Sequence, residues 1–240
     1  MDASCKHSVV AVVGPTATGK TALGVTLAKH FSGEVISCDS MQIYEGLDIG
    51  TAKVTPEETC GIPHHGVDIL TPDISFSVAD FTAMAGKLEQ EISARGNLPI
   101  LVGGTGLYVQ SFLYGVRFTQ EKAPAGLREH LAAELYRRID RRVDKMLEAG
   151  LLKEAQVVWQ NRLRFRTAAQ AIGYKEFFPY FEGTAALDRC TDKLKQASRN
   201  YAKRQLTWFR HMDGVVWLDA GAPDMAQTAI CKTDEFLSKG

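Results

Sequence analysis

The stretch Gly14-Pro15-Thr16-Ala17-Thr18-Gly19-Lys20-Thr21 is the feature that most limits how this chain can fold. It fits the pattern GxxxxGK[ST] at every fixed position, and it lies between the β-branched run Ser8–Val13 and the amphipathic stretch Gly19–Phe31. In such a loop, backbone N–H groups and the helix N-terminus surround a phosphate group. Lys20 reaches the outer phosphates, and the Thr21 hydroxyl can ligate Mg²⁺. The sequence therefore predicts a strand–loop–helix unit that binds a diphosphate or triphosphate, without indicating the reaction.

The first half of the chain continues to alternate short apolar runs with amphipathic stretches. The helix predicted at Ser77–Arg95 opens with an S-x-x-D capping box, formed by Ser77 and Asp80. Further strands are predicted at Glu34–Cys38, Gly66–Leu70 and Pro99–Val102, and a further helix from about Leu107. Strands separated by helices indicate an α/β fold, a P-loop NTPase-like parallel sheet flanked by helices.

The second half has a different pattern, helical and highly charged. Helices are predicted within Leu135–Trp159 and Leu187–His211. Val215–Leu218 is expected to form a last strand that returns to the sheet, followed by a terminal helix at Ala222–Leu237. The chain is thus expected to comprise a P-loop core (1–134), a helical part (135–212) and a returning segment (213–240).

The net charge of zero conceals a strongly basic segment. Residues 1–134 carry 9 Lys/Arg and 15 Asp/Glu, residues 135–212 carry 17 and 8, and residues 213–240 carry 2 and 5. The basic middle segment can form a polyanion-binding face. Because Asp140, Asp144 and Glu148 lie among its arginines, a solvated helical face with internal ion pairs is an equal alternative.

Composition argues against several classes of protein. No apolar run approaches the roughly 20 residues that span a bilayer, and no signal-peptide core is present, so we expect a cytoplasmic protein without membrane contact. The 5 cysteines include no CxxC pair, and their odd number disfavours a disulfide framework or a zinc site. Reduced and mostly buried thiols are expected.

Asp39 is the acidic residue best placed for chemistry. It follows the predicted strand Glu34–Cys38, at the sheet edge that faces the ligand crevice in open α/β folds. There it could act as a general base, bind Mg²⁺ through water, or cap the following turn. The strand Pro99–Val102 leads into Gly103-Gly104-Thr105-Gly106 and not into a Walker-B acid, which disfavours ATP hydrolysis. This glycine-rich turn allows a ligand to approach closely and offers one hydroxyl, on Thr105.

Several longer segments carry a specific resemblance. They are GPTATGKT, SCDSMQIYEGLDIGTAK, IPHHGVDI, FSVADF, LPILVGGTGLY, LYRRIDRRVDKMLEAGLLKE, QAIGYKE and RNYAKRQLTWFR. In this order, and over nearly the whole chain, they resemble the signatures of the bacterial tRNA dimethylallyltransferase family. One departure is that the family carries a helical insertion over the tRNA between the regions of Arg128 and Leu135. Either the insertion is deleted here, or a mobile piece is missing from this sequence, which is the interpretation we favour.

The resemblance implies a reaction and roles for residues already singled out. The family transfers a dimethylallyl group from dimethylallyl diphosphate to N6 of adenine 37, 3′ of the anticodon in tRNA, and releases diphosphate. Lys20, the loop N–H groups and Mg²⁺ would stabilise the departing diphosphate, and Asp39 would accept the N6 proton. Thr105 would bind the adenine or hold Asp39. The segment Asp39, Ser40, Met41 and Gln42 would contact tRNA, with the target base flipped into a channel.

The predicted basic helix offers further RNA contacts. Lys203 and Arg204 could meet RNA phosphates. Tyr201 and Trp208 could stack on bases, although packing in the core suits them better. The other RNA candidates are Thr105 and Arg128, with Gln170, Arg164 and Arg166 weaker. A structural or substrate-lining role is expected for His64 and His65.

Three other functions stay open at this point. They are the same transfer onto free AMP, ADP or ATP, a small-molecule kinase, and a regulatory nucleotide-binding module without catalysis. The basic second half favours tRNA as the acceptor over free nucleotides. We expect a monomer.

Overall fold

A parallel sheet forms the centre of the molecule. The computed structural model describes residues 8–114 and 128–239, with backbone alone for 128–132. The sheet has the order β1-β4-β2-β3, and every neighbouring pair of strands is parallel. The strands are β1 (Val10–Val13), β2 (Gly33–Ser37), β3 (His64–His65) and β4 (Leu98–Gly103).

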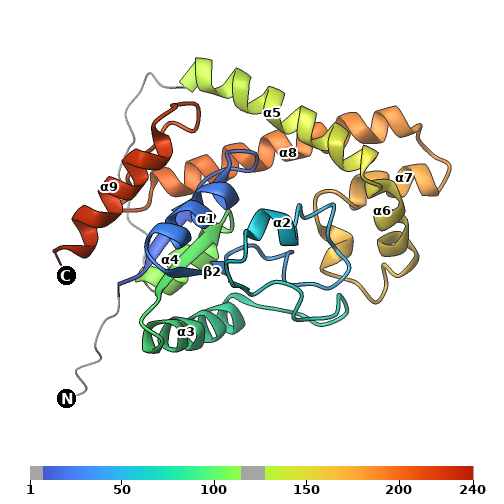
Figure 1. Ribbon diagram of the computed structural model, residues 1–240. Helices are drawn as coiled ribbons and strands as arrows, with labels where there is room; N and C mark the ends of the chain where they lie inside the picture. Colours follow the sequence, from blue (N-terminus) through green and yellow to red (C-terminus); the bar gives the residue numbers. More distant parts are fainter. Residues whose placement is uncertain (1–7, 115–127, 240) are drawn as a thin grey trace.

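Helices cover both faces of this sheet (Figure 1). Successive strand residues point to opposite faces, so Val35 and Ile36 of β2 enter different hydrophobic clusters. The cluster around Val35 includes residues of α1 (Lys20–His30) and α9 (Met225–Leu237). The cluster around Ile36 includes residues of α3 (Val78–Ala94) and α4 (Gly106–Tyr114). The α/β fold expected from the sequence is confirmed.

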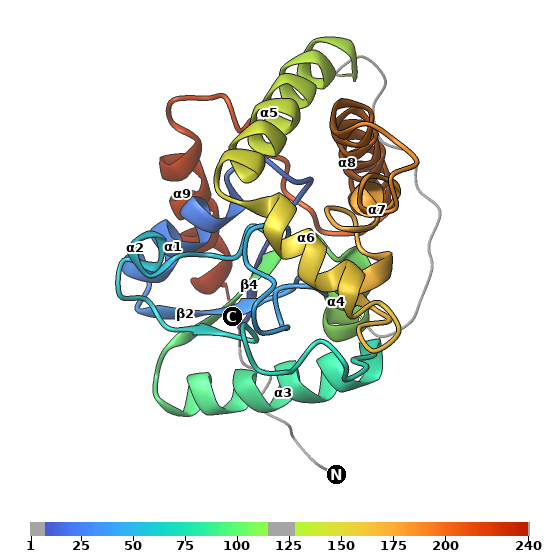
Figure 2. The same ribbon diagram turned by 90° about the vertical axis from the view of Figure 1, so that its right-hand side faces the viewer.

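The helical half is built on a pair of long helices, α5 (Arg128–Glu148) and α8 (Leu187–Arg210), which lie side by side (Figures 1 and 2). Ion pairs join them: Lys195 to Asp144 at 2.6 Å and Arg199 to Asp140 at 2.5 Å. Part of the basic segment is thus a helical face with internal ion pairs. The shorter elements are α2 (Pro56–Thr59), α6 (Leu151–Gln160), the 3-10 turns η1 (Ala168–Gln170) and η2 (Lys175–Phe177), and α7 (Phe178–Phe181).

A third hydrophobic cluster joins the two halves of the chain. Ile43, Tyr44 and Leu47, in the loop after β2, pack with Val143 of α5 and Tyr174. The expected boundary at 134/135 falls inside the continuous helix α5. The helical half therefore rests directly on the loop that carries Asp39, and it covers the carboxyl ends of the strands.

Most predicted elements lie within a few residues of the observed ones. The capping box is present as predicted: the Ser77 hydroxyl accepts from the Asp80 N–H at 3.2 Å, and the Asp80 carboxylate accepts from the Ser77 N–H at 2.9 Å. The helical pattern Leu135–Trp159 is divided into α5 and α6 at Gly150, whose φ of 106° is left-handed.

Two strand predictions are wrong. Val215–Leu218 forms no strand. Val216 and Trp217 face solvent, with 60% and 51% of their surfaces exposed. Leu218 packs against the hydrophobic cluster that includes residues of α1. The strand expected at Gly66–Leu70 is displaced to His64–His65, since Gly66 and Asp68 have positive φ values of 76° and 52°. Positive φ is incompatible with an extended strand.

The structure also bears on the expectations for the cysteine thiols and for membrane-spanning helices. Cys38 and Cys190 are buried free thiols, whereas Cys60 and Cys231 are exposed, so "mostly buried" is right for only half of the four described. Cys5 lies outside the described residues. No helix in the described part of the chain combines the length and apolarity needed to cross a bilayer.

Candidate functional site

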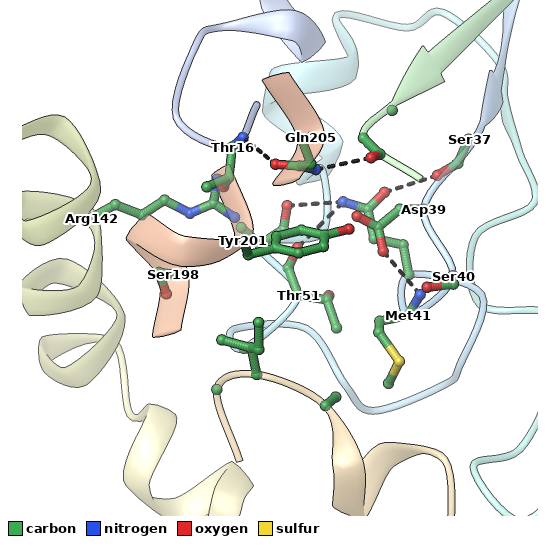
Figure 3. Close-up of a pocket in the computed structure, with 18 of the residues that line it drawn as sticks. Thr16, Ser37, Asp39, Ser40, Met41, Thr51, Arg142, Ser198, Tyr201 and Gln205 are labelled. Atoms are coloured by element: carbon green, nitrogen blue, oxygen red, sulfur yellow. Dashed lines mark hydrogen bonds between the residues drawn. The ribbon is translucent and has the colours of Figure 1, made fainter. Parts of the chain in front are cut away.

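A cavity of about 460 Å³ lies where the carboxyl ends of β2 and β4 meet α5 and α8 (Figure 3). The phosphate loop contributes Thr16, Lys20 and Thr21 to its wall. Further lining residues come from six segments: 37–42, 50–54, 102–104, 139–146 of α5, 167–175, and 194–205 of α8. The cavity is thus shared between the sheet and the helical half.

The phosphate loop adopts a tightly folded conformation. Gly14 and Gly19 have φ values of 152° and 80°, and Ala17 is left-handed at 64°. The Thr18 hydroxyl and the Lys20 ammonium both donate to the Pro15 carbonyl, at 2.8 Å and 2.7 Å. α1 begins at Lys20, so its free N–H groups and positive dipole end face the loop. The strand–loop–helix arrangement is the one that the motif predicts, and binding of an anion by this loop stays a prediction.

Lys20 is electrostatically unusual. Burial, followed by the positive charge of Arg142, lowers the pKa of Lys20 to about 8, and the negative charge of Asp39 opposes this shift. A buried ammonium near a second cation is poorly stabilised until an anion arrives. The site is therefore set to attract a phosphate group.

The affinity for diphosphate is expected to fall as pH rises through about 8. Below that pH Lys20 is already charged in the free protein. Above it Lys20 is mostly neutral, and because a bound anion raises the pKa of Lys20 again, binding is accompanied by uptake of a proton. Calorimetry between pH 7 and 9.5, in two buffers of different ionisation enthalpy, measures this uptake. The Lys20→Met variant is the control for protons taken up by diphosphate itself; equal uptake by both proteins would contradict the prediction.

Asp39 caps the turn that follows β2 and also lines the cavity. Its Oδ1 accepts a hydrogen bond from the Met41 N–H at 2.9 Å, which fixes the turn after β2. The same carboxylate lines the cavity that contains Lys20. The turn-capping bond therefore orients the carboxylate toward the ligand space.

Thr105 holds the backbone around Asp39. Its hydroxyl accepts from the Ser40 N–H at 3.2 Å, and its own N–H donates to the Cys38 carbonyl at 3.1 Å. Of its two expected roles, positioning Asp39 is the one these contacts support. Tyr201 also lines the cavity, and burial raises the pKa of its hydroxyl to about 12.

The glycine-rich turn after β4 brings protein groups together. A Cβ on Gly103 would lie 2.4 Å from the Cys38 carbonyl oxygen, and one on Gly106 would lie 2.3 Å from the Trp208 ring. These glycines allow close packing within the chain, whereas the sequence suggested close approach by a ligand. Gly103 and Gly104 also border the cavity.

Gln205 is a site residue that the sequence analysis missed. This buried side chain of α8 accepts from the Thr16 N–H at 3.0 Å and donates to the Gly104 carbonyl at 2.9 Å. It therefore ties the phosphate loop to the end of β4, as Figure 3 shows. Nothing in its helical surroundings distinguishes it from a solvent-facing glutamine.

Replacing Gln205 with leucine is expected to lower the free energy of unfolding by about 1–3 kcal/mol, because the buried Gly104 carbonyl would lose its partner. Diphosphate binding should weaken as well, since Thr16 would be released. Denaturant unfolding and calorimetry measure both effects. Gln227→Leu makes the same change at an exposed position of α9 and should alter neither; equal effects of the two changes would refute the bridging role.

The segment after Asp39 is held by further contacts. Gln42 accepts from the Ser37 hydroxyl at 2.9 Å and donates to the carbonyls of Thr51 and Ala52 at 3.4 Å and 3.2 Å. Its amide is thus engaged within the protein, while Ser40 and Met41 line the cavity beside it. Contact of these residues with tRNA stays a prediction.

Glu154 of α6 is a second residue that the sequence analysis missed. Its carboxylate accepts from the N–H groups of Asp48, Ile49 and Gly50 at 2.7–2.9 Å and from the Tyr174 hydroxyl at 2.8 Å. It anchors the 48–50 turn, which borders the cavity at Gly50, to the helical half.

The predicted RNA residues fall in different places. Gln170 and Arg204 line the cavity, and the Arg204 guanidinium lies 5.5 Å from the centre of the Tyr201 ring. Lys203 is exposed and lies 5.5 Å from the ring of Tyr136 on α5. Trp208 packs against Gly106, as a core residue would. The side chain of Arg128 lies outside the described residues.

The two histidines have separate environments. His64 borders the cavity, and its Nδ1 lies 2.9 Å from the Ile62 carbonyl oxygen. His65 lies 2.7 Å from Glu34, which also pairs with Arg95 at 2.8 Å. Hydrogen bonds, first from Arg95, hold the pKa of Glu34 at about 2. The expected structural and lining roles fit these contacts.

A metal ion here would need ligands from a bound substrate. The described residues contain no group of three or more His, Cys, Asp or Glu side chains that could hold a cation alone. The Thr21 hydroxyl and the Asp39 carboxylate do border one cavity. This sparse oxygen set fits Mg²⁺, which typically keeps waters and binds through one or two protein groups plus substrate phosphates.

Known proteins resemble the chain over most of its length. The family model described as IPP transferase matches residues 42–134 and 131–212, and the one described as isopentenyl transferase matches residues 7–66. Proteins named tRNA dimethylallyltransferase from Geobacillus kaustophilus and Bacillus subtilis are 42% and 39% identical. Their alignments cover 89% and 91% of this chain and 90% and 92% of the relatives.

Solved structures agree with the sequence relatives. The tRNA delta(2)-isopentenylpyrophosphate transferase of Staphylococcus epidermidis superimposes with a TM-score of 0.86 at 35% identity, covering 98% of this chain and 99% of that one. The tRNA isopentenylpyrophosphate transferase of Bacillus halodurans gives 0.85 at 39% identity, with 98% and 96% covered.

The alignments also indicate that this chain differs from its relatives near the start of α5, where the family's insertion was expected. The Bacillus subtilis alignment has 290 positions but takes in 91% of the 240 residues here, so about 70 positions have no residue in this chain. The two parts of the IPP transferase match meet at residues 131–134, inside the helix that runs unbroken from Arg128 to Glu148. In this chain, α5 therefore passes directly through the junction where the sequence analysis expected an insertion.

Proposed function

The chain belongs to the IPP transferase family, and from this premise we propose how it transfers a dimethylallyl group to tRNA. The donor is dimethylallyl diphosphate, the acceptor is N6 of adenine 37, 3′ of the anticodon, and diphosphate is released. The observation that carries this proposal is that one cavity joins the phosphate loop at Lys20 to the carboxylate of Asp39. No Walker-B acid follows β4, so the loop is better suited to a departing diphosphate than to ATP hydrolysis.

The phosphate loop stabilises the leaving group. As the bond from C1 to the diphosphate oxygen breaks, negative charge develops on the oxygens nearest the loop. Lys20 and the N–H groups at the start of α1 are fixed around that position and need no reorganisation during the reaction. The allylic group helps, because its developing positive charge is delocalised.

Asp39 receives the proton of the attacking amine. The N6 amine is a poor nucleophile because its lone pair is delocalised into the adenine ring. A carboxylate fixed by the Met41 N–H, and flanked by a backbone that Thr105 holds, can accept this proton without first being ordered. Ser40 and Met41, which border the same cavity, would contact the flipped nucleotide.

Mg²⁺ suits the diphosphate end of the cavity. The Thr21 hydroxyl would hold the ion directly and the Asp39 carboxylate through water. When bound, the ion neutralises charge on the diphosphate.

The basic residues around the cavity would position the tRNA. Arg204 and Gln170 lie on its wall and Lys203 on the adjacent surface, where they could meet phosphates of the anticodon stem-loop. Such contacts fix the register of the RNA. Because protein binding releases counterions from the RNA, the affinity for tRNA should fall steeply as the salt concentration rises.

One assay tests the reaction and its acceptor. The protein is incubated with labelled dimethylallyl diphosphate, Mg²⁺ and either unmodified tRNA or free AMP, ADP or ATP. Label should appear in the tRNA at adenine 37. Absence of label there would overturn the proposal; label in a free nucleotide would identify an adenylate-directed enzyme, and phosphate transfer from ATP would identify a kinase.

A further inference from the structure

We propose that Arg142 of α5 binds the diphosphate of the prenyl donor directly and forms, with Lys20, a cationic clamp from the two halves of the chain. This inference rests on the proposed function, since it assigns a further binding residue to the same site. No sequence motif distinguishes Arg142 from the three other arginines in the segment Arg137–Arg142.

The geometry of α5 directs this one arginine inward. Ile139, Arg142, Val143 and Met146 follow helical spacing and all border the cavity. Arg141, its neighbour on the same helix, is exposed. Figure 3 shows the Arg142 side chain extending from α5 toward Thr16 of the phosphate loop. The guanidinium therefore faces the space where the loop would hold a phosphate group.

This guanidinium forms no close ion pair with the acidic side chains that the structure describes. Among the side chains that the structure describes, no carboxylate oxygen lies within the 4.0 Å ion-pair distance of Arg142. The nearest acids on its own helix are committed elsewhere: Asp140 pairs with Arg199, and Asp144 pairs with Lys195. Arg142 thus borders the cavity as a cation that forms no close ion pair with any carboxylate in the described part of the chain, and Asp39 and Glu58 act on it only over longer distances.

The electrostatics of the cavity agree with this geometry. Burial lowers the pKa of Arg142, and the charges of Asp39 and Glu58 oppose this shift. Lys20 and Arg142 border the same cavity as Asp39, and their like charges repel each other, so an anion bound between them would reduce this repulsion. A diphosphate carries several negative charges, and a guanidinium can donate two parallel hydrogen bonds to phosphate oxygens.

The clamp has a mechanical consequence. Lys20 belongs to the P-loop core and Arg142 to the helical half, so a diphosphate held by both would fasten α5 to the phosphate loop. Diphosphate alone, without tRNA, should then protect the backbone amides of α5 near residue 142 from hydrogen exchange.

The test is calorimetric titration of inorganic diphosphate with Mg²⁺, in the absence of tRNA, into the full chain and its variants. Arg142→Gln should weaken diphosphate binding by about 10- to 100-fold, as expected for loss of a charge-assisted hydrogen bond. Arg142→Lys should fall between that variant and the unchanged protein, because a lysine keeps the charge but not the forked geometry. Arg141→Gln is the matched control on the exposed side of α5 and should change binding by less than about two-fold.

A second measurement separates ligand binding from a structural role. Without ligand, Arg142→Gln should unfold at nearly the same temperature as the unchanged protein, whereas the rise in unfolding temperature caused by diphosphate with Mg²⁺ should be smaller in the variant. Diphosphate binding by Arg142→Gln with unchanged affinity would overturn the inference and leave the proposed function intact. Failure of the unchanged protein to bind diphosphate would overturn both.

Discussion

Replacing Asp39 with asparagine is expected to slow dimethylallyl transfer to tRNA by about 100- to 10,000-fold, the usual contribution of a general base. Asparagine has nearly the same shape, and its Oδ1 can still accept the Met41 N–H, so the turn after β2 should persist. What is lost is the negative charge and the ability to take the N6 proton. Alanine would also remove the hydrogen bond from the Met41 N–H, so asparagine tests the charge of Asp39 more specifically.

Single-turnover rates with saturating donor and tRNA measure this effect, and calorimetry checks that diphosphate still binds. Asp188→Asn serves as the control, because Asp188 is an exposed carboxylate in the first turn of α8, away from the cavity residues. Near-normal turnover of Asp39→Asn would show that Asp39 is not the general base.

Replacing Lys20 with methionine is expected to reduce transfer by about 100- to 1,000-fold, as removal of a preorganised charge opposite a developing anion does. Diphosphate binding should weaken in parallel, which distinguishes this variant from Asp39→Asn. Stability should not fall, because methionine keeps the length of the apolar stem and removes an ammonium whose burial lowers its pKa to about 8.

Kinetics, calorimetry and thermal unfolding of Lys20→Met measure the three effects together. Lys29→Met, at an exposed position in the last turn of the same helix, is the control. If Lys20→Met bound diphosphate normally and transferred at the ordinary rate, the phosphate loop would have no role in the reaction.

Much of the fold followed from local patterns. The phosphate loop, its strand and its helix were predictable because the motif encodes a backbone conformation through its two glycines, both of which have positive φ here. The capping box of α3 was predictable because its two hydrogen bonds join residues only three positions apart. The strand expected at Val215–Leu218 was wrong because β-branched and aromatic residues show a propensity, whereas pairing depends on a free sheet edge and on burial.

Part of the site was also predictable. Asp39 could be identified because the carboxyl ends of parallel strands share one edge of a sheet, which puts it beside the phosphate loop. Its orientation by Met41 and the support that Thr105 gives to Ser40 required the structure.

The phosphate loop illustrates which features of this protein the sequence predicts and which require the tertiary structure. Gly14–Thr21 by itself predicted a phosphate-binding loop and determined how the surrounding strand and helix are arranged. Only the tertiary structure decided that Gln205, 189 positions from Thr16, completes the loop and that Arg142 faces it from α5. The physical reason is that helical periodicity indicates which side chains share a face, whereas the packing of α5 and α8 on the loop after β2 decides what that face meets.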